Sequence, residues 1–412
     1  MKWEEVPIGS VGRVITGNTP PKSNKSFYGG VYKFIKPTDI EISTKYTRNT
    51  EETYSEIAAK KYKNSMLPPK TTCVVTIGSI GKKITMTDSN CFVNQAINAV
   101  IPDKNRYDED FIFYALKFIL PKVKNADTGA SSGRENVSKS NFSSLTILTP
   151  KSIETQRRIA GILSAFDDLI ENNSKRIRLL EESAQLLYKE WFVNFRFPGH
   201  ESTKFVNGLP DGWERVKLST VLKKLESGSR PKGGIDKSMK NGYPSLGAES
   251  IMDLGVFDYS KEKFISEDFA MKMRKGLIED RDILLYKDGA YIGKTTLFQD
   301  SFPYEKSFVN EHVYLLRATE EHLQYYLYNT LHLSQYYELL QSLNSNSAQP
   351  GLNKDKIQDI EINLPELHYL IIYDKNIGVF MKLLFNIAKQ NAKLKQARDL
   401  LLPKLLSGEI EV

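Results

Sequence analysis

The chain is poor in the residues that build metal sites and disulfide frameworks. Its 412 residues include two cysteines, Cys73 and Cys91, and five histidines. The cysteines form no CxxC motif and the histidines no HExxH or CxxH grouping, which argues against a zinc site. No uncharged apolar stretch reaches the ~18–20 residues of a membrane span, and the first ten residues lack the basic and then apolar order of a signal peptide. We therefore expect a soluble, cytoplasmic protein without a cofactor.

Catalytic motifs are absent as well. Transfer of a methyl group from S-adenosylmethionine to a base would need a Gly-rich cofactor loop and an Asn/Asp-Pro-Pro-aromatic or Pro-Cys element. Thr19–Lys22 and Leu67–Lys70 have paired prolines without the required flanking residues, so we interpret them as rigid turns. Gly289–Thr295 resembles a phosphate-binding loop but is one residue short, and nothing marks a nucleophile elbow. The sequence thus favours a chain that is not an enzyme.

Length and charge narrow the class of protein further. At roughly 150 residues per domain, the length predicts two or three domains. The net charge of +7 lies in residues 1–150, which carry 21 Lys and Arg against 14 Asp and Glu, whereas residues 199–365 carry 21 against 24. A moderately basic domain is compatible with nucleic-acid binding, but Lys-rich solvated surfaces are common, so charge alone does not decide the partner.

The sequence is repeated once, at an offset of 210–217 residues. Six segments recur in the same order. They are Trp3–Val6 with Trp213–Val216, Gly17–Lys22 with Gly228–Lys232, Ile80–Lys82 with Ile292–Lys294, Phe92–Gln95 with Phe308–Glu311, 128–136 with 345–353, and Phe166–Phe192 with Phe380–Leu406. Chance does not produce six segments in register, so the sequence predicts a tandem duplication.

Each copy has a globular part followed by a long helical stretch. Short runs rich in β-formers and bounded by Gly, Asn or Asp predict strands, and amphipathic runs predict helices. The predicted strands are Cys73–Ile77, Ile97–Ile101, Ile283–Tyr286 and His312–Leu316, and the predicted helices are Phe111–Leu120 and Leu323–Leu340. We expect an α+β chain with two mixed α/β domains at 1–150 and 199–365, followed by long helices within 151–198 and 366–412.

The two long helices carry matching apolar heptads. Their apolar positions recur at steps of three, four or seven residues, and Asn173, Asn391 and Arg398 are polar interruptions. The positions are Ile159, Ile162, Phe166, Leu169, Ile177, Leu180, Ala184, Leu187 and Trp191 in the first helix and Phe380, Ile387, Leu394 and Leu401 in the second. Two helices that each cover their own domain would give a similar pattern, but the match between them favours an antiparallel coiled coil.

Three pairs of loops recur at matching places in the two copies. They are Thr16–Lys25 with Ser227–Lys237, Gly78–Lys83 with Lys287–Thr295, and Thr128–Lys139 with Gln341–Lys354. Lys and backbone N–H groups suit phosphates, and Arg, Asn and Ser suit base edges, although ordinary solvated turns have the same composition. The tips differ between copies, since Asn94 and Gln95 become Asn310 and Glu311. The candidate DNA-binding residues are Lys22, Lys25, Lys82, Lys83, Arg134 and Asn136 in the first domain and Arg230, Lys232, Lys237, Lys294 and Asn353 in the second.

Four segments carry a resemblance to a known family. Lys189–Gly199 resembles the end of the central conserved helix of Type I restriction-modification specificity subunits, and Leu209–Glu214 the start of their second target-recognition domain. Leu400–Ile410 is similar to their C-terminal helix ending, and Glu154–Ile159 to the start of their first conserved helix. The corresponding start of the second helix, Glu366–Ile371, departs from the family pattern.

The resemblance implies a noncatalytic, sequence-specific DNA-binding subunit. Its two target-recognition domains would each read half of a split site, and its helix pair would space the halves. The helices would dock two methyltransferase subunits, joined by motor-nuclease restriction subunits, and the chain alone would self-associate. Two other hypotheses stay open: a coiled-coil adaptor with two protein-binding modules, and a methyltransferase-nuclease whose catalytic part has diverged.

Overall fold

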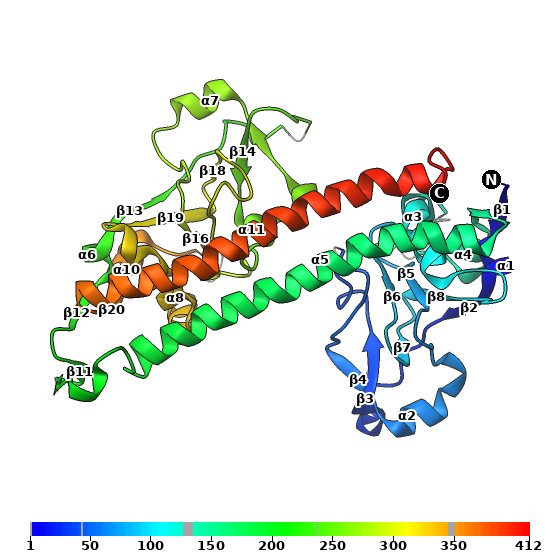
Figure 1. The fold of residues 1–412 in the computed structure, drawn as a ribbon, viewed down its shortest axis with the longest axis horizontal. Helices are drawn as coiled ribbons and strands as arrows, with labels where there is room; N and C mark the ends of the chain where they lie inside the picture. The colour runs from blue at the N-terminus through cyan, green and yellow to red at the C-terminus, as the bar shows by residue number, and fades with distance from the viewer. Residues whose placement is uncertain (1, 43, 127–134, 237, 345–350) are drawn as a thin grey trace. The chain divides into compact units, whose positions relative to one another are not determined.

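The computed structural model describes the chain except for residues 1, 43, 127–134, 237 and 345–350, and the chain divides into two compact units (Figure 1). Unit 1 comprises 1–172 with 393–412, and unit 2 comprises 173–392. Two long helices, α5 (Ile153–Tyr188) and α11 (Leu367–Leu406), contribute residues to both units. Among the residues described, no helix combines the length and apolar character that a membrane crossing requires.

Unit 1 is built on three small sheets. Their strand orders are β2-β8-β5-β6, β4-β3-β7 and β1-β9. Helix α3 begins where Asp108 accepts a hydrogen bond from the N–H of Phe111, and its apolar face covers the first sheet. The elements are β1 (Trp3–Pro7), α1 (Ile8–Val11), β2 (Gly12–Thr16), β3 (Tyr28–Ile35), β4 (Glu52–Tyr54), α2 (Glu56–Lys61), β5 (Thr72–Val75), β6 (Ile84–Met86), β7 (Cys91–Val93), β8 (Ile97–Pro102), α3 (Glu109–Asn125), α4 (Lys139–Ser144) and β9 (Thr146–Pro150).

Unit 2 repeats this architecture. Its sheets have the orders β13-β19-β16-β17, β15-β14-β18 and β12-β20, with a small hairpin β10-β11. The elements are β10 (Phe205–Val206), β11 (Leu209–Pro210), β12 (Glu214–Lys217), α6 (Leu218–Val221), β13 (Leu222–Ser227), β14 (Tyr243–Leu246), β15 (Phe264–Ile265), α7 (Glu267–Lys272), β16 (Ile283–Tyr286), β17 (Thr295–Leu297), β18 (Phe308–Val309), β19 (Val313–Ala318), α8 (Gln324–His332), α9 (Ser334–Ser342), α10 (Lys354–Gln358) and β20 (Glu361–Leu364).

The duplication inferred from the sequence is confirmed by the strand pairings. Every pairing within the three sheets of unit 1 has a counterpart of the same direction in unit 2, including the one parallel pair, β3 with β7 and β14 with β18. The alignment of the third loop needs a correction of two residues. Ser138 caps α4 and Asn353 caps α10, so Asn353 corresponds to Ser138 and not to Asn136.

The four predicted strands correspond to β5, β8, β16 and β19, and the predicted helix at 111–120 lies within α3. The helix predicted over 323–340 is wrong as a single element. It is two helices, α8 and α9, separated at Leu333, whose backbone is extended with ψ 142°. Apolar residues recur at helical spacing on both sides of the break, so periodicity alone did not locate it.

The long helices pair in an antiparallel coiled coil within unit 1. Asp167 of α5 contacts Arg398 of α11, while Leu163 lies in one apolar cluster with Leu402. Residue numbers thus rise along α5 as they fall along α11. The predicted positions Ile162 and Leu169 are wrong, because these side chains are 37% and 45% exposed. The buried line instead runs through Ile159, Leu163, Asp167 and Ile170.

The same antiparallel order holds within unit 2. The Asn391 amide donates a hydrogen bond to the Ser174 hydroxyl at 3.3 Å, and Tyr188 packs edge-on against Tyr373. Gly255 lies between Ile177 and Leu384, which places the domain against both helices. Helix α11 begins at Leu367 and ends at Leu406.

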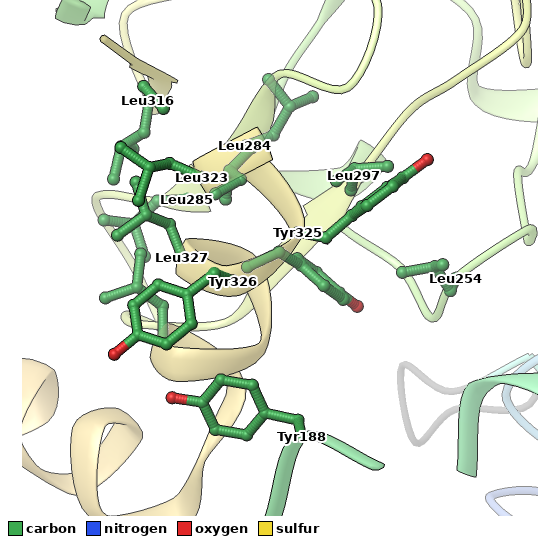
Figure 2. Close-up of a cluster of buried hydrophobic side chains, with 14 of the residues drawn as sticks. Tyr188, Leu254, Leu284, Leu285, Leu297, Leu316, Leu323, Tyr325, Tyr326 and Leu327 are labelled. Carbon is green, nitrogen blue, oxygen red and sulfur yellow. The ribbon is translucent and has the colours of Figure 1, made fainter. Parts of the chain in front are cut away.

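A tyrosine-rich core joins α5 to α8 in unit 2 (Figure 2). Tyr188 and Tyr326 lie with ring centroids 5.6 Å apart, and the Tyr188 hydroxyl is 2.7 Å from that of Thr330. Leucines from β16, β17 and β19 form the other side of this cluster, as Figure 2 shows. The end of α5 is therefore part of the hydrophobic core of unit 2. This packing fixes the sheet that contains β16, β17 and β19 relative to α5.

Candidate nucleic-acid interface

In unit 1, several strand ends meet at one edge of the sheet β2-β8-β5-β6. The last residue of β2, Thr16, pairs with Asn98 near the start of β8, and the last residue of β5, Val75, pairs with Ile97. The register alone therefore brings together the segments that leave these strand ends. We call them the loop edge of unit 1, and they are the loops 17–27, 76–83 and 94–96.

Unit 2 has the corresponding loop edge. Ser227 at the end of β13 pairs with Tyr314, and Tyr286 at the end of β16 pairs with Val313. The loops that meet there are 228–242 except residue 237, 287–294 and 310–312. The first two of the three loop pairs singled out in the sequence are thus gathered at one edge in each unit.

Part of the third loop pair also reaches these edges. Ile77 forms an isolated bridge with Asn136 in unit 1, and Asp288 forms one with Gly351 in unit 2. The next residues, Val137 and Leu352, are buried and anchor the segment in the core. Each edge therefore combines loops from distant parts of the sequence, which is the geometry of a binding surface carried on a rigid scaffold.

The loop edge of unit 2 carries a cluster of charged side chains. Arg230 Nε lies 2.8 Å from Glu311 Oε1, and His312 Nε2 lies 3.3 Å from the same oxygen. The other ring nitrogen of His312 is 3.3 Å from the Asp288 carboxylate. Lys287 donates a 3.1 Å hydrogen bond to the Glu311 backbone carbonyl. These contacts link the side chains of three loops in one arrangement.

The loop edge of unit 1 is uncharged at the matching places. The Thr19 hydroxyl donates a hydrogen bond to the Gln95 amide oxygen. Below it, the Thr16 hydroxyl donates to the Asn98 amide oxygen at 2.6 Å, and the Asn98 amide donates to the Thr76 hydroxyl at 3.1 Å. The two edges thus share a backbone arrangement while differing in charge.

The predicted lysines of unit 1 are spread over its loops. Lys22, Lys25 and Lys82 are exposed, and Lys22 has a weak contact of 3.9 Å with Glu52. Lys83 donates a 2.6 Å hydrogen bond to the Pro37 carbonyl, which gives it a local structural role. Asn136 lies at the loop edge through its bridge to Ile77, and Arg134 lies outside the described residues.

In unit 2, the structure separates the predicted residues. Arg230 belongs to the charged cluster and Lys232 is exposed on the same loop, whereas Lys237 lies outside the described residues. Lys294 pairs with Asp253 at 3.0 Å, in a group that includes Glu181 of α5 rather than Arg230. Asn353 accepts a hydrogen bond from the N–H of Asp355, so its side chain caps α10.

The residues at the loop edges that the sequence prediction did not name as candidates include Gln95, Lys287, Asp288, Glu311 and His312. A signal for two of them was present, because Gln95 and Glu311 end the repeated segments Phe92–Gln95 and Phe308–Glu311. The prediction chose basic residues and asparagines, and therefore passed over the acid Glu311. Among the described residues, no group of three or more His, Cys, Asp or Glu side chains is arranged to hold a metal ion.

Glu181 gives unit 2 a pH-dependent stability. Burial, with the charge of Asp253 as the second cause, raises the pKa of Glu181 to about 7 from 4.5. The folded state then keeps this proton at pH values where the unfolded chain loses it, so stability falls as pH rises from about 4.5 to 7. We expect Glu181→Gln to raise the free energy of unfolding by about 1–3 kcal/mol at pH 8 and by little at pH 4. Urea unfolding at both pH values measures this, with exposed Glu182→Gln as the control; equal effects of the two changes would contradict it.

A duplicated α/β domain, a loop edge on each copy and an antiparallel helix pair define a class of two-domain scaffold. The chain belongs to the family of the Type I restriction modification DNA specificity domain. The sequence model of this family matches residues 1–182 and 210–397. It is therefore a Type I restriction-modification specificity subunit, as the sequence resemblance implied.

Individual relatives agree with this assignment. The chain is 27% identical over 418 residues to the Type I restriction enzyme MjaIX specificity subunit of Methanocaldococcus jannaschii, covering 100% of this chain and 94% of that one. It is 31% identical over 181 residues to the HindI specificity subunit of Haemophilus influenzae, covering 43% and 39%. The crystal structure of the Type-I restriction-modification system S subunit from M. genitalium matches with a TM-score of 0.58 at 18% identity, covering 98% and 96%, which shows a shared fold.

Proposed function

We propose that this chain is the noncatalytic DNA-reading subunit of a Type I restriction-modification complex. Its two globular domains each read one half of a split site in double-stranded DNA. The observation that carries the proposal is the loop edge: the same edge is built twice in one chain, with different side chains at matching positions. A duplicated scaffold with altered polar tips suits the reading of two different short sequences.

The helix pair supplies the second part of the proposal. On α5 and the π-helical turn Lys189–Val193 that follows it, Leu179, Leu186 and Val193 are each more than 40% exposed and lie seven residues apart. On α11, Ile372 and Val379 are exposed with the same spacing. Apolar residues that recur every seven positions form a stripe suited to a partner helix. We infer that methyltransferase subunits dock on such stripes, two per chain.

The division of labour follows from these roles. Methylation and cleavage belong to the methyltransferase and motor-nuclease partners, and the four-segment organisation 1–150, 151–198, 199–365 and 366–412 separates reading from docking. The helices set the number of unread base pairs between the two halves of the site. When partners are missing, the apolar stripes would drive self-association of the chain.

Co-expression with the neighbouring methyltransferase subunit tests this function. We expect methylated adenines in genomic DNA to define a motif of two halves with a fixed gap, and we expect that motif to vanish when this chain is omitted. A soluble, associated pair of proteins that gives no chain-dependent motif would favour the adaptor hypothesis. Methylation by this chain alone would show that it is an enzyme.

A further inference from the structure

The two loop edges place a contacting polar pair at the same two positions. In unit 1 the pair is Thr19 with Gln95, and in unit 2 it is Arg230 with Glu311. Each pair joins the loop that follows the first strand of the four-stranded sheet to the turn before its second strand. The positions are thus the same while the chemistry has changed from a hydroxyl and an amide to a guanidinium and a carboxylate.

Backbone hydrogen bonds establish that the turns carrying Gln95 and Glu311 are equivalent. Asn94 N–H donates to the Ile35 carbonyl at 3.1 Å, and Asn310 N–H donates to the Leu246 carbonyl at 2.9 Å. The side chain of each asparagine then accepts a hydrogen bond from the N–H two residues on. Gln95 and Glu311 therefore occupy the same place in the same turn.

The loops carrying Thr19 and Arg230 are fixed by a close approach of two backbones. A Cβ on Gly17 would lie 2.2 Å from the Val93 carbonyl oxygen, and one on Gly228 would lie 1.6 Å from that of Val309. Two residues after each glycine comes the first member of the pair. The glycine contact thus sets the position of Thr19 and of Arg230 relative to its partner.

The pair in unit 2 consists of a covered carboxylate and an exposed guanidinium. Both carboxylate oxygens of Glu311 are covered, and within the described part of the chain they accept no hydrogen bond. The carboxylate forms an ion pair with Arg230, and His312 Nε2 lies 3.3 Å from the same oxygen. Arg230 itself is 59% exposed. An exposed guanidinium that covers a carboxylate suits a ligand that offers an acceptor to Arg230 and, as the pair opens, a donor to Glu311.

We propose that these two positions are the main specificity-determining pair of each domain. This inference rests on the proposed DNA-reading function. Arg230 recognises O6 and N7 of a guanine while Glu311 accepts from N4 of a cytosine, so unit 2 reads a G·C pair at this position. Gln95, positioned by Thr19, donates to N7 and accepts from N6 of an adenine, so unit 1 reads an A·T pair.

Exchanging the pair between the domains tests the assignment. We expect Arg230→Thr with Glu311→Gln, co-expressed with the methyltransferase subunit, to change the preferred base pair at one position of one half-site. Discrimination for G·C at that position should fall about tenfold to a hundredfold. The other half-site and the gap should be unchanged. The reciprocal Thr19→Arg with Gln95→Glu should act on the other half-site only.

An ion pair away from the loop edge provides the matched control. Lys217 and Asp359 lie 2.7 Å apart, are exposed and belong to unit 2. Lys217→Thr with Asp359→Gln removes the same charges and should leave the motif intact. The single change Glu311→Gln repeats the test with the least disturbance if the double variant does not assemble, as judged by co-purification with the methyltransferase.

The outcomes separate this inference from the proposed function. Absence of any two-part motif with the unchanged chain would overturn the proposed function. A two-part motif that the exchange variants leave as it was, or a half-site for unit 2 without a G·C pair, would overturn the pair assignment while the function stands. A shift at one position, in the half-site assigned to the altered domain, supports both.

Discussion

Replacing Arg398 with alanine should lower the free energy of unfolding of unit 1 by about 3–5 kcal/mol. Arg398 and Asp167 are 6% and 4% exposed at their side chains and form an ion pair between α5 and α11. Asp167 also accepts a 2.7 Å hydrogen bond from the Tyr114 hydroxyl. Without the guanidinium, a buried carboxylate loses its cation. Lys117 lies near the pair, and its pKa is lowered to about 8 by burial first and by the charge of Arg398 second.

A double variant separates the effect of the lost charge pair from the effect of the lost side-chain volume. The double change Arg398→Met with Asp167→Leu removes both charges and should cost much less than Arg398→Ala, because no unpaired charge stays buried. Hydrogen exchange of the full-length chain measures the effect locally, in α3 and the first half of α5. If the double variant is as unstable as the single one, packing rather than charge holds this contact.

Gly228→Ala should have the second large effect, with a cost of about 3 kcal/mol or more. The new Cβ would meet a backbone carbonyl oxygen, that of Val309, which cannot rotate away as a side chain would. The turn 310–312 must then move, and Glu311 moves with it. We therefore expect loss of one half of the methylation motif, with the half read by unit 1 preserved.

Gly161, which has space for a side chain, provides a control in which the change to alanine should raise rather than lower stability. Gly161 lies in α5 with no atom within 4 Å of the position of an added Cβ. Gly161→Ala should raise stability by about 0.5–1 kcal/mol, because alanine favours the helix. Thermal unfolding and motif mapping of both variants check the pair of expectations. An intact second half-site in Gly228→Ala would show that the turn tolerates the shift.

Periodicity in the sequence was sufficient to predict the two long helices. It was not sufficient to predict which residues are buried between them. The apolar steps predicted two helices in antiparallel pairing, and both units show it. Asp167, however, occupies a buried position that a hydrophobicity pattern assigns to apolar residues. Its burial is tolerated because Arg398, more than 200 residues away in sequence, compensates the charge. No local pattern contains that information.

The sequence by itself determined the duplication, the mixed α/β class, the long helices and the family, because repeated segments and heptads are properties of residue order. Only the tertiary structure decided which loop residues lie next to one another. Gln95 and Thr19, or Glu311 and Arg230, meet because strand register and a glycine contact bring separate loops to one edge of a sheet. The same contacts placed Lys294 beside Asp253 and made Asn353 a helix cap. Composition can suggest which loop residues are candidates for binding, but packing and strand register decide which residues lie beside them.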